Sequence, residues 1–237
     1  MTLHRLDLTR IRAITLDLDD TLWPVWPTIT HAEDTLRTWL DAHAPRTAAL
    51  ARDAQAVQGA RRTALAFLHG QSHDLGALRR EAIRQLLAAA GDDTALAHPA
   101  FEVFLAARHQ VSLFDDALPA LAALSARYPV IALSNGNADV HRVGIGGYFR
   151  AAVSAADVGV GKPDARIFPA AAQAAGVAPA QVLHIGDDAL LDGQGALAVG
   201  MQMAWVNRAR APWPEDVPAQ PHVEVGDLAA LCAWLGA

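Results

Sequence analysis

The 237-residue sequence has one cysteine, Cys232, so no intrachain disulfide can form and a reducing compartment is expected. It also lacks any apolar run near the roughly 18 residues that a membrane-spanning helix needs. Residues 1–12 carry several charged side chains and no continuous apolar segment, which is unlike a secretory signal. These absences predict a cytoplasmic protein that has no membrane partner.

Basic residues are also scarce. Asp and Glu outnumber Lys and Arg by 25 to 19, which gives a net charge of -6 and a pI near 5.9. Nucleic acids and anionic membranes both require a basic face, so neither is expected as a partner. Of the 19 basic residues, 18 are arginine, and Lys162 is the single lysine. The 52% hydrophobic fraction excludes a disordered chain.

Short apolar runs with β-branched members recur along the chain and end in polar residues, which is typical of buried strands in a parallel sheet. These strands are expected at residues 13–18, 129–133, 151–154, 181–185 and 201–206. Helical patterns lie between them at 116–127, 165–176 and 189–200, and two of these end at Gly176 and Gly200. The alternation predicts an α/β fold with a Rossmann-like parallel sheet.

One connection interrupts this alternation, because more than a hundred residues separate Thr21 from Ser134. Apolar residues in this stretch recur with a spacing near 3.6, which is typical of helices. The expected helices cover 28–43, 46–69, 75–90 and 95–109. We therefore expect a core domain made of residues 1–22 and 116–237, with an inserted all-α cap domain at 23–115.

Polar residues follow three of the predicted strands. In open α/β sheets ligands bind beyond the carboxyl ends of the strands, so these residues are expected at one edge of the sheet. Each of them alone is compatible with a turn or a helix cap, but their joint arrival at one edge indicates a functional site. In chain order, with the lone lysine included, they are Asp17, Asp19, Thr21, Ser134, Asn135, Lys162 and Asp187.

The series Asp-x-Asp-x-Thr, Ser-Asn-Gly, Gly-Lys-Pro-Asp and Gly-Asp-x-x-x-x-Asp resembles the four motifs of the haloacid dehalogenase superfamily. The resemblance covers the core, and the position of the insert is similar to that of the helical cap in the phosphatase branch. Segments 16–23, 134–138 and 184–192 resemble bacterial phosphatases of the flavin mononucleotide and phosphoribitylamino-pyrimidine type.

This resemblance implies a phosphatase that works through an aspartyl-phosphate intermediate. Asp17 would be the nucleophile, and Asp19 would protonate the leaving alkoxide and later take a proton from water. Mg²⁺ suits the oxygen ligands on offer, which would be the Asp17 carboxylate, the Asp19 backbone carbonyl and Asp187. Asp188 and Asp192 are weaker candidates for the metal, and the alternative for both is a role behind the ligands or as a helix cap.

The remaining residues would position the phosphate and the substrate. Ser134 offers a hydroxyl, Asn135 a backbone N–H and Lys162 a compact positive charge. The Thr21 hydroxyl either bonds Asp17 or caps a turn. Arg79, in the expected cap, either faces the substrate or belongs to a solvated helix face.

Several functions remain open. Asp19 favours phosphoryl transfer over carbon–halogen cleavage, because a halide leaving group needs no proton. A phosphomutase acting on a sugar phosphate would use the same two aspartates, and a non-catalytic metabolite-binding module is the third alternative. The expected partner is a small-molecule phosphate ester such as flavin mononucleotide or a related pyrimidine precursor, with a monomer or homodimer as the assembly. His184, on an apolar strand, is expected to be a satisfied core histidine.

Overall fold

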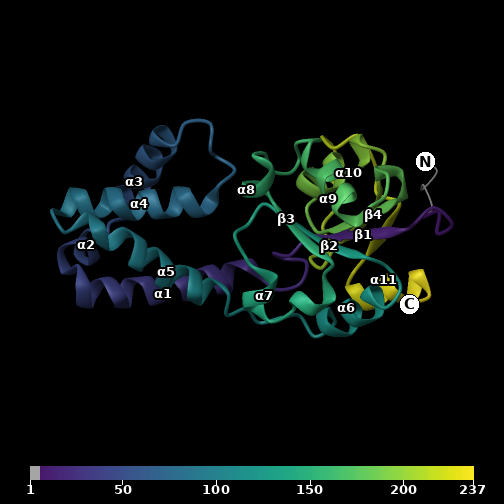
Figure 1. Ribbon diagram of the computed structural model, residues 1–237, viewed down its shortest axis with the longest axis horizontal. Helices are drawn as coiled ribbons and strands as arrows, with labels where there is room; N and C mark the ends of the chain where they lie inside the picture. The colour runs from purple at the N-terminus through teal and green to yellow at the C-terminus, as the bar shows by residue number, and fades with distance from the viewer. Residues whose placement is uncertain (1–5) are drawn as a thin grey trace. The chain divides into compact units, whose positions relative to one another are not determined.

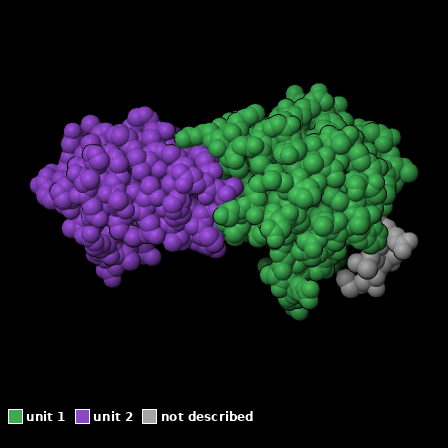
Figure 2. All heavy atoms as spheres, turned by 90° about the horizontal axis from the view of Figure 1, so that it is seen from below, with its two compact units in different colours: residues 1–24, 112–237 green, residues 25–111 purple. Residues whose placement is uncertain are grey.

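The computed structural model describes residues 6–237. The chain divides into two compact units, one comprising the segments up to residue 24 and from residue 112 onward, and the other comprising residues 25–111 (Figure 2). We refer to them as the core unit and the helical unit. Among the described residues, no helix combines the length and the apolar character needed to cross a membrane.

The core unit contains a six-stranded parallel sheet with the strand order β3-β2-β1-β4-β5-β6. This confirms the predicted α/β fold with a Rossmann-like sheet. Its sixth strand was not predicted, because three residues are too short to show a pattern. The strands are β1 (Ala13–Leu16), β2 (Val130–Ser134), β3 (Ala151–Ser154), β4 (Val182–Gly186), β5 (Gln202–Val206) and β6 (Val223–Val225).

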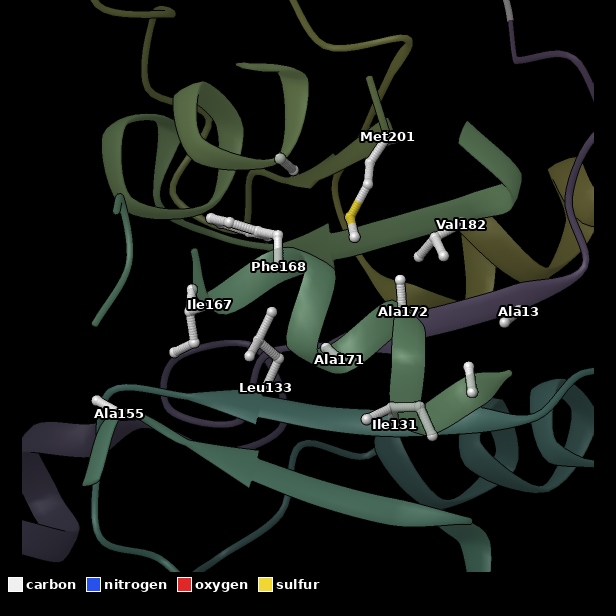
Figure 3. Packing of buried hydrophobic residues seen from close by; sticks show 12 residues of the cluster. Ala13, Ile131, Leu133, Ala155, Ile167, Phe168, Ala171, Ala172, Val182 and Met201 are labelled. Atoms are coloured by element: carbon white, nitrogen blue, oxygen red, sulfur yellow. The ribbon is translucent and has the colours of Figure 1, made fainter. Parts of the chain in front are cut away.

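Helices cover both faces of this sheet (Figure 1). Helices α9 (Ile167–Ala175) and α10 (Gly195–Ala198) lie on one face, and α6 (Ala117–Ser125) and α11 (Leu228–Leu235) lie on the other. Because side chains alternate along a strand, one set of strand residues meets α9 in a fully buried cluster (Figure 3). That cluster includes Ala13, Ile131, Leu133, Val182, Ile167, Phe168, Ala171 and Ala172.

The shorter elements of the core unit connect these layers. The helix predicted at 189–200 is in fact two elements, a π-helical turn η4 (Ala189–Gln194) followed by α10. Asp188 caps this turn, because its side chain accepts hydrogen bonds from the backbone N–H groups of Leu190 and Leu191, each at 2.8 Å. The other short elements are α7 (Val140–Val143), η2 (Gly146–Tyr148), α8 (Ala155–Val158) and η3 (Pro179–Gln181).

The described part of the helical unit consists of helices. The prediction of a single helix at 46–69 is wrong, because the helix is interrupted at residues 51–53. There the Asp53 side chain accepts a hydrogen bond from the Gln55 backbone N–H at 2.8 Å and caps the start of a new helix. The elements are α1 (Val25–His43), α2 (Pro45–Leu50), α3 (Ala54–Phe67), α4 (Leu75–Ala90), η1 (Thr94–Leu96) and α5 (Ala97–Arg108).

Candidate active site

The central strands of the core unit end next to one another. β1 pairs with β2 on one side and with β4 on the other, and the strand order changes direction between β1 and β4. Asp17 follows β1, Ser134 ends β2, and Asp187 follows β4. Ligands of doubly wound sheets bind at such a switch point, so the fold places these predicted residues at the expected edge.

The loop after β1 turns sharply. Asp20 has a φ of 57°, in the left-handed region, and its backbone N–H donates to the Trp23 carbonyl at 2.7 Å. The indole N–H of the fully buried Trp23 donates to Asp19 Oδ1 at 2.8 Å. The Asp19 carboxylate is therefore oriented by an indole that follows it in the same loop, a contact that the sequence reasoning missed.

Lys162 is buried between two carboxylates. Its Nζ atom donates to Asp17 Oδ1 at 2.5 Å and to Asp192 Oδ1 at 2.6 Å. The Asn135 side chain makes two hydrogen bonds to the backbone of Lys162. Its Oδ1 atom accepts from the Lys162 N–H at 2.7 Å, and its Nδ2 atom donates to the Lys162 carbonyl at 2.8 Å. A Cβ at Gly161 would lie 2.7 Å from Asn135 Oδ1, so the close approach of the Asn135 side chain to this backbone favours glycine at position 161. The structure thus shows a positioning contact of the Asn135 side chain in addition to the backbone role expected for that residue.

Two other predicted residues have partners that differ from the expectation or refine it. The Thr21 hydroxyl donates to Asp187 Oδ1 at 3.0 Å, a partner that differs from Asp17, which was one of the two alternatives for this residue. The Ser134 hydroxyl oxygen accepts from the Gly136 N–H at 2.9 Å, and the side chain is buried. The Trp205 indole donates to the Asp187 backbone carbonyl at 2.7 Å and holds the start of that loop.

The charges at this edge do not balance. Burial alone would raise the pKa of Asp192, but Lys162 and His184 hold it well below its usual range. Burial raises the pKa of Asp17 well above its usual range, and the Asp192 and Asp187 charges add to that effect against Lys162. Burial, together with Asp192, raises the pKa of Asp187 to about 7. Lys162 therefore compensates Asp192 most strongly, and it offsets the charges of Asp17 and Asp187 only in part.

A divalent cation fits this excess of negative charge. Asp17, Asp187 and Asp192 each offer an oxygen, and these oxygens lie within 4.8 Å of one another. The Asp192 oxygens already accept hydrogen bonds from Lys162, His184 and the Asp188 N–H, at 2.6, 3.0 and 3.0 Å. Asp17 and Asp187 are consequently the carboxylates available to a hard cation such as Mg²⁺.

Arg79 lies on α4, in the helical unit. It forms an ion pair with Glu33, and its guanidinium carbon lies 4.2 Å from the centre of the Phe104 ring. These contacts anchor Arg79 within its own unit, and its role toward a substrate stays a prediction.

The same motifs and fold occur in known proteins. The family model for haloacid dehalogenase-like hydrolases matches residues 11–200. The chain belongs to this family. A solved structure of a 2-haloacid dehalogenase from Pseudomonas syringae pv. Tomato is 36% identical and superposes with a TM-score of 0.89, with 95% of this chain and 98% of that chain covered.

Two curated phosphatases of the family are also similar. The 5-amino-6-(5-phospho-D-ribitylamino)uracil phosphatase YigB of Escherichia coli is 31% identical over 96% of this chain and 98% of its own length. A phosphoserine phosphatase of Thermus thermophilus is 35% identical over 65% of this chain and 63% of its own length. The chain is thus a haloacid dehalogenase-like hydrolase whose curated relatives include phosphatases.

Proposed function

We propose that the chain is a Mg²⁺-dependent phosphatase that hydrolyses a small phosphorylated metabolite through an aspartyl-phosphate intermediate. The observation that carries the proposal is the buried group at the switch point, in which Lys162 contacts Asp17 beside Asp187. A carboxylate can attack a dianionic phosphomonoester only where positive charge offsets the repulsion. The similarity to YigB, a 5-amino-6-(5-phospho-D-ribitylamino)uracil phosphatase, favours a phosphorylated pyrimidine precursor as the substrate.

In the first step a carboxylate oxygen of Asp17 forms a bond to phosphorus while the bond to the leaving oxygen breaks. Asp19, oriented by Trp23, gives its proton to that leaving alkoxide. In the second step Asp19 takes a proton from water as the water oxygen bonds to phosphorus. The acyl-phosphate P–O bond then breaks, which releases inorganic phosphate and restores Asp17.

The other residues hold this arrangement in place. Lys162 offsets charge at Asp17, and Asn135 fixes the Lys162 backbone. A Mg²⁺ ion held by Asp17, the Asp19 carbonyl and Asp187 would supply positive charge that favours approach of the phosphate. A cation bound there would lower the raised pKa values of Asp17 and Asp187 and would favour the ionised form of the nucleophile.

The test is a panel of phosphate esters assayed with Mg²⁺ and with a chelator. We expect phosphate release from at least one small ester with Mg²⁺ and none with the chelator. Asp19→Asn should lower kcat by about 100-fold or more, because general acid–base catalysis contributes roughly 10²–10⁴-fold. Asp34→Asn, an exposed carboxylate of α1, is the matched control and should leave turnover unchanged. Absence of turnover over the whole panel would refute the proposal, and isomerisation of a sugar phosphate faster than phosphate release would favour a mutase.

A second candidate, a 2-haloacid dehalogenase, is favoured by the 36% identity to the Pseudomonas syringae structure. In that reaction Asp17 would displace halide from carbon, and water would then attack the carboxyl carbon of the ester. Turnover in ¹⁸O-labelled water separates the two. A phosphatase places the label in inorganic phosphate, whereas a dehalogenase places it in the Asp17 carboxylate, which mass spectrometry of the peptide detects.

A further inference from the structure

His184, in the middle of β4, lies fully inside the core unit. Both of its ring nitrogens have partners: Nδ1 lies 2.8 Å from Thr15 Oγ1, and Nε2 lies 3.0 Å from Asp192 Oδ1. Thr15 is its neighbour in the sheet register between β1 and β4. The expected satisfied core histidine is therefore present, but one of its partners is the carboxylate that holds Lys162.

The surroundings decide where the ring carries its proton. Burial lowers the pKa of His184, so the imidazole is neutral near pH 7 and has one N–H. The ionised Asp192 can only accept, so this hydrogen sits on Nε2. Nδ1 then accepts the hydrogen of the Thr15 hydroxyl. Asp192 thereby selects the tautomer, and the Thr15 hydroxyl satisfies the nitrogen that is left without a hydrogen. The Phe168 ring stands at 89° to the imidazole, with centroids 5.3 Å apart, and restricts the ring plane.

Asp192 connects His184 to the proposed nucleophile, because it contacts both His184 and the Lys162 ammonium that contacts Asp17. Its Oδ1 atom accepts from both His184 and Lys162, while Oδ2 accepts from the Asp188 backbone. A Cβ at Gly186 would overlap the Asp192 carboxylate, so that glycine allows the close approach. Without the His184 N–H, Oδ1 would keep the Lys162 ammonium as its donor, and the carboxylate could rotate and draw the ammonium away from Asp17.

We propose that His184, whose Nδ1 is held by the Thr15 hydroxyl, is a positioning residue whose Nε2–H holds Asp192 so that Lys162 stays against Asp17. The proposal deepens the phosphatase assignment, and its kinetic readout rests on that proposed function. Partners that orient the groups around a reacting centre typically contribute about 10–100-fold to activity. The chain of contacts runs from Thr15 through His184, Asp192 and Lys162 to Asp17.

The variants that test this are His184→Leu, His184→Gln and Thr15→Val. Leucine removes the donor, whereas the side-chain amide of glutamine can place an N–H near the position of Nε2. We expect kcat to fall about 10–100-fold in His184→Leu with KM within about twofold, and to recover to within about threefold of wild type in His184→Gln. Thr15→Val, which keeps the shape and removes the hydroxyl, should give an intermediate loss of kcat. Equal loss in the leucine and glutamine variants would overturn the proposal.

A second readout does not depend on turnover. Because Lys162 is the only lysine, labelling lysine with ¹⁵N and ¹³C gives one side-chain signal by NMR. We expect a sharp, slowly exchanging ammonium signal in wild type and in His184→Gln, and a shifted or broadened one in His184→Leu. An unchanged signal in His184→Leu would overturn the proposal. A signal that responds as expected in a protein without phosphatase activity would support the positioning role and refute the proposed function.

Discussion

Replacing Lys162 is the sharpest perturbation of the charge balance at this site. The ammonium is buried within 2.5 Å of Asp17 Oδ1 and 2.6 Å of Asp192 Oδ1. Lys162→Met leaves both carboxylates without a cation, and removing one partner of a buried pair typically costs about 3–5 kcal/mol of folding free energy. Lys162→Arg keeps the charge but puts a wider, planar group into a space fitted to a compact one.

We therefore expect different results from the two variants. Lys162→Met should be strongly destabilised in chemical denaturation, and Lys162→Arg should lose only about 1–3 kcal/mol through overpacking. In steady-state assays with a phosphate ester, Lys162→Arg should still lose about 100-fold in kcat, because a misplacement near 1 Å has that effect. Arg127→Lys, a matched exchange at a guanidinium that donates to the Leu235 carbonyl and to none of the site residues, should leave kcat unchanged. Wild-type turnover in Lys162→Arg would refute the argument that this site requires a small ammonium.

Two further predictions concern the same edge of the sheet. Trp23→Phe removes the indole N–H that orients Asp19, so the hydrolysis of alkyl phosphates should slow about tenfold. The hydrolysis of p-nitrophenyl phosphate, whose leaving group needs little protonation, should slow much less. Equal effects on the two substrates would contradict this prediction. Because the pKa of Asp187 is raised from 3.8 to about 7, the metal-free protein should lose up to about 4 kcal/mol of stability as pH rises through that window. Mg²⁺ should therefore raise Tm more at pH 8 than at pH 5, and Asp187→Asn should remove this difference; a Mg²⁺ effect independent of pH would contradict it.

The strands and the edge that carries the site were predictable because they depend on local patterns. Apolar runs ending in acids located β1 and β4, and strand order then brings Asp17 and Asp187 together. Details that depend on loop conformation were not predictable. The Thr21 hydroxyl contacts Asp187 from a loop in which Asp20 adopts a left-handed conformation, and nothing in the sequence pattern signals that conformation.

Contacts between residues far apart in the sequence could not be predicted either. The π-helical turn that contains Asp192 looks like an ordinary helix in the sequence, yet it carries the carboxylate that meets Lys162 and His184. The side-chain role of Asn135 depends on its approach to Gly161, which lies 26 positions later in the chain. Sequence patterns indicated which residues lie at the site, and the tertiary structure determines which hydrogen bonds and ion pairs these residues form with one another.

The central claim is that Asp17 attacks phosphorus. It is tested most directly by comparing Mg²⁺-dependent release of inorganic phosphate by wild type and by Asp17→Asn on the best substrate of the panel, with circular dichroism and Tm confirming that both fold. The account predicts turnover in wild type and a loss of at least about 1,000-fold in Asp17→Asn, because an amide cannot form the covalent intermediate. Near-normal turnover in a folded Asp17→Asn protein would contradict it.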